Sequence, residues 1–176
     1  MVYLNDGTGH FTKESTNRFA ALLPSAPYWT VQVVDADGDG LPDVLVGGYE
    51  WVVCPTCGGR SRSAAPTTVL LSQREGGYRA VKLPAVAGEG TVMDFVVTGA
   101  SGNRAIWVDR TSGDTNVDTY LSRTLQRVSW PDLVSTVPLT TRSSPWVPWI
   151  IPATNGTTLS IVSDNARDGF TPITVP

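Results

Sequence analysis

The chain has 176 residues, of which 41% are hydrophobic, enough for one folded domain with an apolar core. Sixteen acidic residues outnumber thirteen Lys and Arg residues, so the net charge is -3 and nucleic acid is not an expected partner. Every apolar run is shorter than the roughly 20 residues that a membrane span requires, and Met1 is not followed by the residues of a signal peptide. We therefore expect a globular protein without a membrane span.

Short β-branched runs, rather than helical periodicity, dominate the chain. The 17 Gly and 13 Pro residues interrupt almost every window in which a helix would need regular apolar spacing. Turn sequences such as "NDGTG", "EGG" and "SGN" separate the runs, which predicts an all-β chain of antiparallel hairpins. The expected strands are residues 2–4, 11–13, 30–34, 43–47, 68–72, 78–83, 92–97, 105–109, 119–122, 126–130, 146–151, 159–162 and 171–175.

One sequence frame occurs three times along the chain. Residues 33–46 ("VVDADGDGLPDVLV") share glycine and apolar positions with residues 95–108 ("FVVTGASGNRAIWV") and, more weakly, with residues 149–162 ("WIIPATNGTTLSIV"). A strand, a glycine turn and an aromatic-led strand also occur at residues 2–14 and again at residues 69–81. Four-stranded units at such spacing are typical of β-propeller blades, whereas a β-sandwich would not predict self-similarity.

The repeats predict that residues 1–176 form one segment, a partial β-propeller of four-stranded antiparallel blades, with a β-sandwich as the alternative. The expected units are repeats at about 30–83, 92–130 and 146–176, with residues 2–14 as the outer hairpin of another blade. About three blades are fewer than the roughly four to eight of a closed propeller. We therefore expect the chain to self-associate or to join the remaining blades of a longer polypeptide.

The stretch "DADGDGLPD", residues 35–43, places carboxylates between two apolar runs. Without a cation, carboxylates on one side of a tight loop repel one another, whereas calcium binds such oxygens together with main-chain carbonyls. The candidate metal ligands are the side chains of Asp35, Asp37, Asp39 and Asp43 and the carbonyl of Leu41. The spacing also opens an EF-hand loop, but its twelfth position is Val46 rather than Glu, and strands rather than helices flank it. The sequence thus predicts a strand–loop–strand Ca²⁺ site.

Two stretches in the first half of the chain resemble a known repeat. Residues 31–48 ("VQVVDADGDGLPDVLVGG") resemble the FG-GAP or VCBS repeat of integrin-α-like β-propellers, and residues 3–15 ("YLNDGTGHFTKES") resemble the outer hairpin that links such repeats. The resemblance implies calcium binding by the D-x-D-G-D-G-x-x-D loop. The later copies keep only the glycine and the apolar frame, with Val97, Gly99 and Ser101 at the first three aspartate positions. A second calcium site is therefore not expected.

Cys54 and Cys57 form one C-x-x-C motif, and no other cysteine occurs. Zinc normally takes four ligands, and the one histidine, His10, lies far away in the sequence. A redox motif would open a helix, but a glycine-rich and serine-rich loop follows. The two remaining alternatives are a local disulfide in an oxidising compartment and a pair of thiols.

The sequence favours binding over catalysis. It contains no G-x-S-x-G, no H-E-x-x-H and no phosphate loop. Tyr49 and Trp51 extend the calcium hairpin, and Trp146 lies in a proline-rich stretch, so these aromatic residues could contact a sugar or a protein, although core packing is the alternative for each tryptophan.

Proteins of the resembled family include adhesion receptors, lectins, and propeller scaffolds attached to secreted enzymes or toxins. The resemblance implies a non-catalytic, calcium-stabilised module for binding or cell adhesion that recognises carbohydrate or extracellular protein. The expected location is secreted or at the cell surface. The alternatives are a propeller segment of a secreted polysaccharide-active enzyme and a structural scaffold in a large surface protein or toxin.

Overall fold

The computed structural model describes residues 3–13, 19–26, 28–48, 65–100, 102–111, 122–142, 150–155, 158–165 and 169–173. Within these ranges every regular element is a β-strand, and no helix is long and apolar enough to cross a membrane. The strands are β1 (Tyr3–Asn5), β2 (Phe11–Lys13), β3 (Tyr28–Val34), β4 (Asp43–Gly48), β5 (Thr68–Ser72), β6 (Tyr78–Lys82), β7 (Thr91–Thr98), β8 (Arg104–Thr111), β9 (Ser122–Trp130), β10 (Ser135–Arg142), β11 (Ile150–Asn155), β12 (Thr158–Asn165) and β13 (Gly169–Ile173). The all-β prediction is confirmed.

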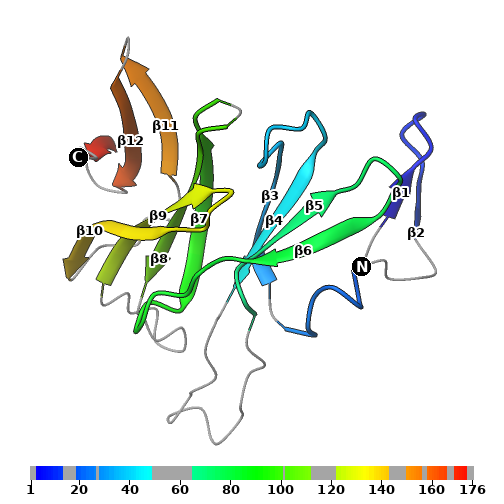
Figure 1. Cartoon of the computed structure of the whole chain (residues 1–176), viewed down its shortest axis with the longest axis horizontal. Helices are drawn as coiled ribbons and strands as arrows, with labels where there is room; N and C mark the ends of the chain where they lie inside the picture. The colour runs from blue at the N-terminus through cyan, green and yellow to red at the C-terminus, as the bar shows by residue number, and fades with distance from the viewer. Residues whose placement is uncertain are drawn as a thin grey trace, which may run out of the picture.

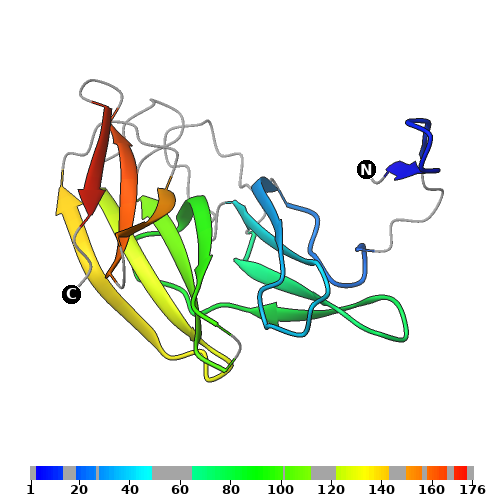
Figure 2. The ribbon, with the colours of Figure 1, turned by 90° about the horizontal axis from the view of Figure 1, so that it is seen from above.

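Each sheet consists of strands that follow one another in the sequence (Figure 1). Two antiparallel sheets have four strands, in the orders β3-β4-β5-β6 and β7-β8-β9-β10, a third contains β11-β12-β13, and β1 pairs with β2. The first strand of a sheet packs against the sheet before it, because β7 contacts β3 and β4, and β11 contacts β7. Meanders placed in succession in this way fit the blades of a partial β-propeller, and open antiparallel sheets packed face to face also fit the β-sandwich alternative. Figure 2 shows the β1–β2 hairpin apart from these sheets.

An apolar core joins the first four-stranded sheet to the second. Alternate residues of a strand point to opposite faces, so Leu45 of β4 turns toward the second sheet while its neighbours Val44 and Val46 turn away. The buried members of this core are Ala36, Leu45, Val69, Leu71, Leu83, Val92, Phe95, Ile106, Val108 and Val128.

The backbones of β4 and β7 approach closely within this core. A Cβ atom on Gly47 would lie 2.6 Å from Val92 Cγ1 and 2.9 Å from Phe95 Cζ, so only glycine fits there. The hydroxyl of Thr30 donates to the carbonyls of Val92 and Met93 at 3.3 and 3.0 Å. Close packing and hydrogen bonds together fix β7 against β3 and β4.

A second core joins β7–β9 to the third sheet. Val96, Trp107, Leu125 and Ile150 are all buried in one cluster. The amide of Ile150 donates to Asp94 Oδ2 at 2.9 Å, which fixes the start of β11 on β7. The second sheet therefore has apolar cores on both faces, as an internal blade requires.

A buried ion pair lies beside this second core. Arg123 donates Nε to Asp109 Oδ1 at 2.9 Å and Nη2 to Asp109 Oδ2 at 2.7 Å. Burial raises the pKa of Asp109 to about 6, although the bonds and charge of Arg123 oppose the shift, and the charge of Asp94 adds to it. This bidentate pair joins β8 to β9 inside the molecule.

The second sheet is longer than the sequence predicts. The sequence predicts separate strands at residues 119–122 and 126–130, but β9 is one strand from Ser122 to Trp130, and residues 119–121 lie outside the described ranges. The sequence predicts that this repeat ends at about residue 130, but the sheet continues with β10 to Arg142. The sequence does not predict β10 because this strand contains Pro138, and proline is rare in strands except at edges and bulges. β10 is an edge strand, and its register shifts between Thr136 and Leu139.

Candidate metal site

The candidate site is the turn between β3 and β4, residues 35–42. Gly38 and Gly40 have φ of 91° and 86°, in the left-handed region that favours glycine. Asp35 Oδ1 accepts from the amide of Gly38 at 2.6 Å, and its Oδ2 accepts from the amide of Gly40 at 3.2 Å. The turn thus winds around its own first carboxylate.

Two further aspartates complete the turn. Asp37 Oδ1 accepts from the amide of Asp39 at 3.1 Å, and Asp39 Oδ1 accepts from the amide of Leu41 at 2.8 Å. Asp35, Asp37 and Asp39 each offer one oxygen, and these three oxygens lie within 4.8 Å of one another. Three carboxylate oxygens so close together repel one another unless a cation lies between them. They are also the hard donors that Ca²⁺ prefers, so this donor set fits a divalent cation.

Asp43, the fourth expected ligand, is not among the carboxylates that converge. It is fully buried at the start of β4. Its Oδ2 accepts from the amide of Ala36 and its Oδ1 from the amide of Ser72, both at 2.8 Å. Burial raises the pKa of Asp43, although these two amides lower it, and the charge of Asp37 raises it further. Asp43 therefore anchors the base of the turn to β5.

Two arginines from outside the turn contact it. Arg104, the first residue of β8, donates Nη1 to the carbonyl oxygen of Asp35 and Nη2 to Asp35 Oδ2, the latter at 3.3 Å. Arg74, in the β5–β6 turn, donates Nη2 to the carbonyl oxygen of Asp39 at 2.9 Å. Neither contact could be inferred from the sequence, because the partners are 69 and 35 residues apart.

The corresponding turn of the second sheet, between β7 and β8, is shorter and also contains two glycines with positive φ. Gly99 and Gly102 have φ of 87° and 84°, and the amide of Asn103 donates to the carbonyl of Ala100 at 3.0 Å. Residues 99–103 contain no carboxylate. Instead, the residue that follows this turn is Arg104, which reaches back to the acidic turn.

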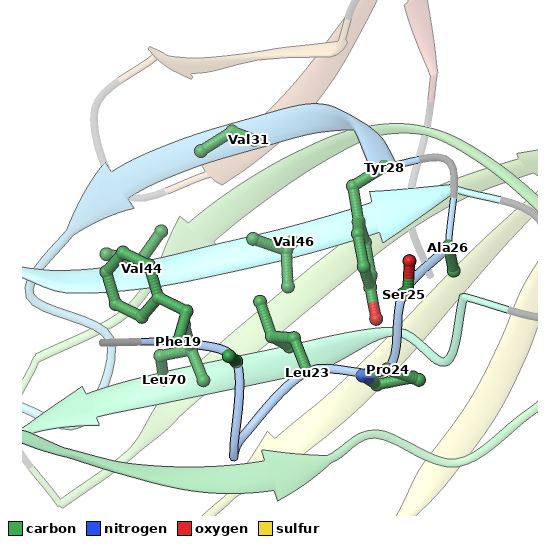
Figure 3. Close-up of a pocket in the computed structure, with 11 residues that line it drawn as sticks. Phe19, Leu23, Pro24, Ser25, Ala26, Tyr28, Val31, Val44, Val46 and Leu70 are labelled. Atoms are coloured by element: carbon green, nitrogen blue, oxygen red, sulfur yellow. The ribbon is translucent and has the colours of Figure 1, made fainter. Parts of the chain in front are cut away.

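An apolar groove lies on one face of the first sheet, opposite the face that packs against the second sheet. It has a volume of about 560 Å³ and lies between residues 19–26 and the sheet (Figure 3). Val44, Val46 and Leu70 point into it from β4 and β5. The exposed fraction of Val31, which also lines it, is 59%, so the groove is open. This face is apolar like an interior face, but no sheet in the described part of the chain packs on it.

Five residues singled out in the sequence lie outside the described ranges. They are Tyr49, Trp51, Cys54, Cys57 and Trp146. Ligand contact by the aromatic residues and disulfide formation by the cysteines stay predictions.

The family model described as the FG-GAP-like repeat matches residues 1–46. The matched segment contains β1, β2, β3, the acidic turn and the first part of β4. No curated protein and no solved structure matches the chain. The match lies on the two stretches that resemble this repeat in the sequence.

Proposed function

We propose that this protein, which carries an FG-GAP-like repeat at residues 1–46, is a non-catalytic β-propeller module that calcium stabilises and that recognises a partner outside the cell. The observation that carries the proposal is the convergence of Asp35, Asp37 and Asp39 in the turn between β3 and β4. These three side chains would hold the ion, with the carbonyl of Leu41 as a further donor. A bound calcium ion would neutralise the carboxylates and tie the ends of β3 and β4 together.

The donor set favours calcium over magnesium. Calcium accepts six to eight oxygens in flexible arrangements, whereas magnesium requires near-ideal octahedral geometry and retains several waters. The proposed donors come from one short turn, and the proposed main-chain carbonyl of Leu41 suits a flexible shell. Calcium modules outside the cell bind with Kd of roughly 10⁻⁴ to 10⁻³ M, so titrations should extend into this range.

The buried acids of the second sheet support a structural role. Asp109 is fully buried and both of its oxygens accept from Arg123, so the Asp94–Asp109 pair offers no accessible carboxylate pair for glycoside cleavage. The alternative, a segment of a polysaccharide-active enzyme, therefore gains no support from this pair.

The proposed partner is an extracellular carbohydrate or protein, with Tyr49, Trp51 and Trp146 as the candidate contact residues. A glycan array probed with and without calcium tests whether the partner is a carbohydrate. Binding without product formation supports a recognition module, and loss of binding in Trp51→Ala assigns the contact. Release of cleaved glycan would contradict the non-catalytic proposal.

The calcium part of the proposal is tested by the thermal stability of three proteins. Wild type should unfold at higher temperature as calcium rises, because a ligand of the folded state adds about 2.7 kcal/mol at 100 times its Kd. Asp37→Asn should lose this gain, whereas Asp132→Asn, which removes an exposed carboxylate from the β9–β10 turn, should keep it. A wild-type Tm that is the same in calcium and in chelator would contradict the proposal.

A further inference from the structure

We propose that Arg104 is a built-in counter-cation of the acidic turn: its guanidinium balances Asp35 when no metal is bound and competes with calcium for Asp35 Oδ2. This inference rests on the calcium site proposed above, and it gives that site a regulator on the neighbouring sheet.

The contact geometry singles out Arg104. Its guanidinium makes two bonds to one residue, because Nη1 bonds the carbonyl oxygen of Asp35 and Nη2 bonds the carboxylate at 3.3 Å. The exposed side-chain fractions of Arg104 and Asp35 are only 17% and 30%, so water screens this pair less than a surface pair. Arg104 Nε is buried and has no hydrogen-bond partner in the described part of the chain. Asp35 is therefore the partner that holds this guanidinium.

Competition follows from the coordination capacity of Asp35. Its Oδ2 already accepts from the amide of Gly40 and from Arg104, and a carboxylate oxygen has only about two lone-pair sites. A positive charge beside the donor also repels a divalent ion. Calcium binding at Oδ2 must therefore weaken the bond from Arg104.

This competition connects metal occupancy to the contact between sheets. Arg104 begins β8, whereas Asp35 follows β3 directly, so their bond joins the first sheet to the second. Without metal, the arginine holds the turn; with metal, the ion holds the turn and the arginine retains at most its bond to the main-chain carbonyl. The same side chain thus stabilises the metal-free turn and lowers its affinity for calcium.

Calorimetric calcium titration and metal-free thermal unfolding of four proteins test the inference. Arg104→Gln removes the charge, Arg104→Lys keeps it, and Arg74→Gln removes the charge of an exposed arginine that bonds only a carbonyl of the same turn. Arg104→Gln should bind calcium about tenfold more tightly, since removal of one neighbouring positive charge lowers the Coulomb cost of binding. The same variant should unfold at lower temperature without metal. Arg104→Lys and Arg74→Gln should stay within about twofold of the wild-type Kd.

The outcomes separate this inference from the proposed function. Absence of calcium binding by wild type overturns the calcium site itself. If wild type binds but Arg104→Gln binds equally or more weakly, the calcium site stands and the competition is wrong, because a purely structural arginine would lower stability and affinity together. If Arg104→Gln does not fold, the wild-type protein decides: the ¹⁵N resonance of the Arg104 guanidinium, assigned by its loss in Arg104→Lys, should shift with calcium at the calorimetric Kd. An unchanged resonance at saturation overturns the inference.

Discussion

At the scale of the residue, the four aspartates of residues 35–43 have two different roles. Asp35, Asp37 and Asp39 present oxygens to one another, whereas Asp43 is buried and bonded to the main chain. A residue of the first kind stabilises the folded chain only through a bound ion. A residue of the second kind stabilises the folded chain whether or not an ion is present. The two kinds can therefore be told apart by stability in chelator.

Asp43→Ala should lower the free energy of unfolding by about 2–6 kcal/mol in calcium and in chelator alike. The amides of Ala36 and Ser72 would each lose a buried acceptor, and each unsatisfied buried group costs roughly 1–3 kcal/mol. Urea unfolding in both conditions measures the change. A loss confined to the calcium condition would instead make Asp43 a metal ligand.

At the scale of the element, the contact between neighbouring sheets depends on β4 and β7. Gly47 gives β4 the space to pass Val92 and Phe95, and Thr30 bonds the backbone of β7. In the second sheet, the Asp109–Arg123 pair joins β8 to β9 on the face toward β11. These features predict the effects of two substitutions.

Gly47→Ala should destabilise the protein by about 1–3 kcal/mol, because the added methyl overlaps Val92 and Phe95. Phe95→Leu in the same chain should relieve part of the overlap, so the double variant should lose less than the sum of the single losses. Chemical denaturation of the four proteins measures this coupling. Additive losses would show that the two positions are not in contact.

The buried Asp109 should make stability fall as pH rises from about 4 to about 6. Its pKa is about 6 in the folded chain against an ordinary value of 3.8, so the folded state holds more protons in this window. Asp109→Asn removes the titration and keeps the shape of the side chain. Relative to this variant, wild type should lose on the order of 3 kcal/mol across the window. If the stabilities of the two proteins change with pH in parallel, the raised pKa of Asp109 is contradicted.

At the scale of the whole molecule, the sheets have uncovered apolar surface. Val31 pairs with Val46, and Val33 pairs with Val44, so all four side chains lie on the groove face of the first sheet. The exposed fractions of Val31 and Val33 are 59% and 64%. An internal blade buries both faces, so this face is the expected contact for another sheet.

The isolated chain should therefore self-associate in a concentration-dependent manner. Val31→Lys should weaken the association, because a charge on this face opposes apolar contact. Val134→Lys is the matched control, since Val134 is also exposed but lies in the β9–β10 turn. Sedimentation velocity over a range of concentrations measures the effect. A wild-type monomer at every concentration would contradict self-association through this face.

The sequence predicts those features whose chemistry is local. The acidic turn can be predicted from the sequence because its aspartates and glycines lie within nine consecutive residues, 35–43. The bonds of Ser72 to Asp43 and of Arg104 to Asp35 span 29 and 69 residues and leave no local signal. The sequence does not predict the edge strand β10, because this strand contains Pro138 and is mostly polar. The spacing of residues in the sequence thus predicts the turn, whereas its contacts with Ser72 and Arg104 are seen only in the folded structure.

The most direct measurement of the central claim is a crystal structure determined with calcium in excess and with anomalous data. We expect an anomalous peak within coordinating distance of Asp35, Asp37 and Asp39, with the bond from Arg104 to the Asp35 carboxylate lengthened. Water alone among these carboxylates at saturating calcium would contradict the account.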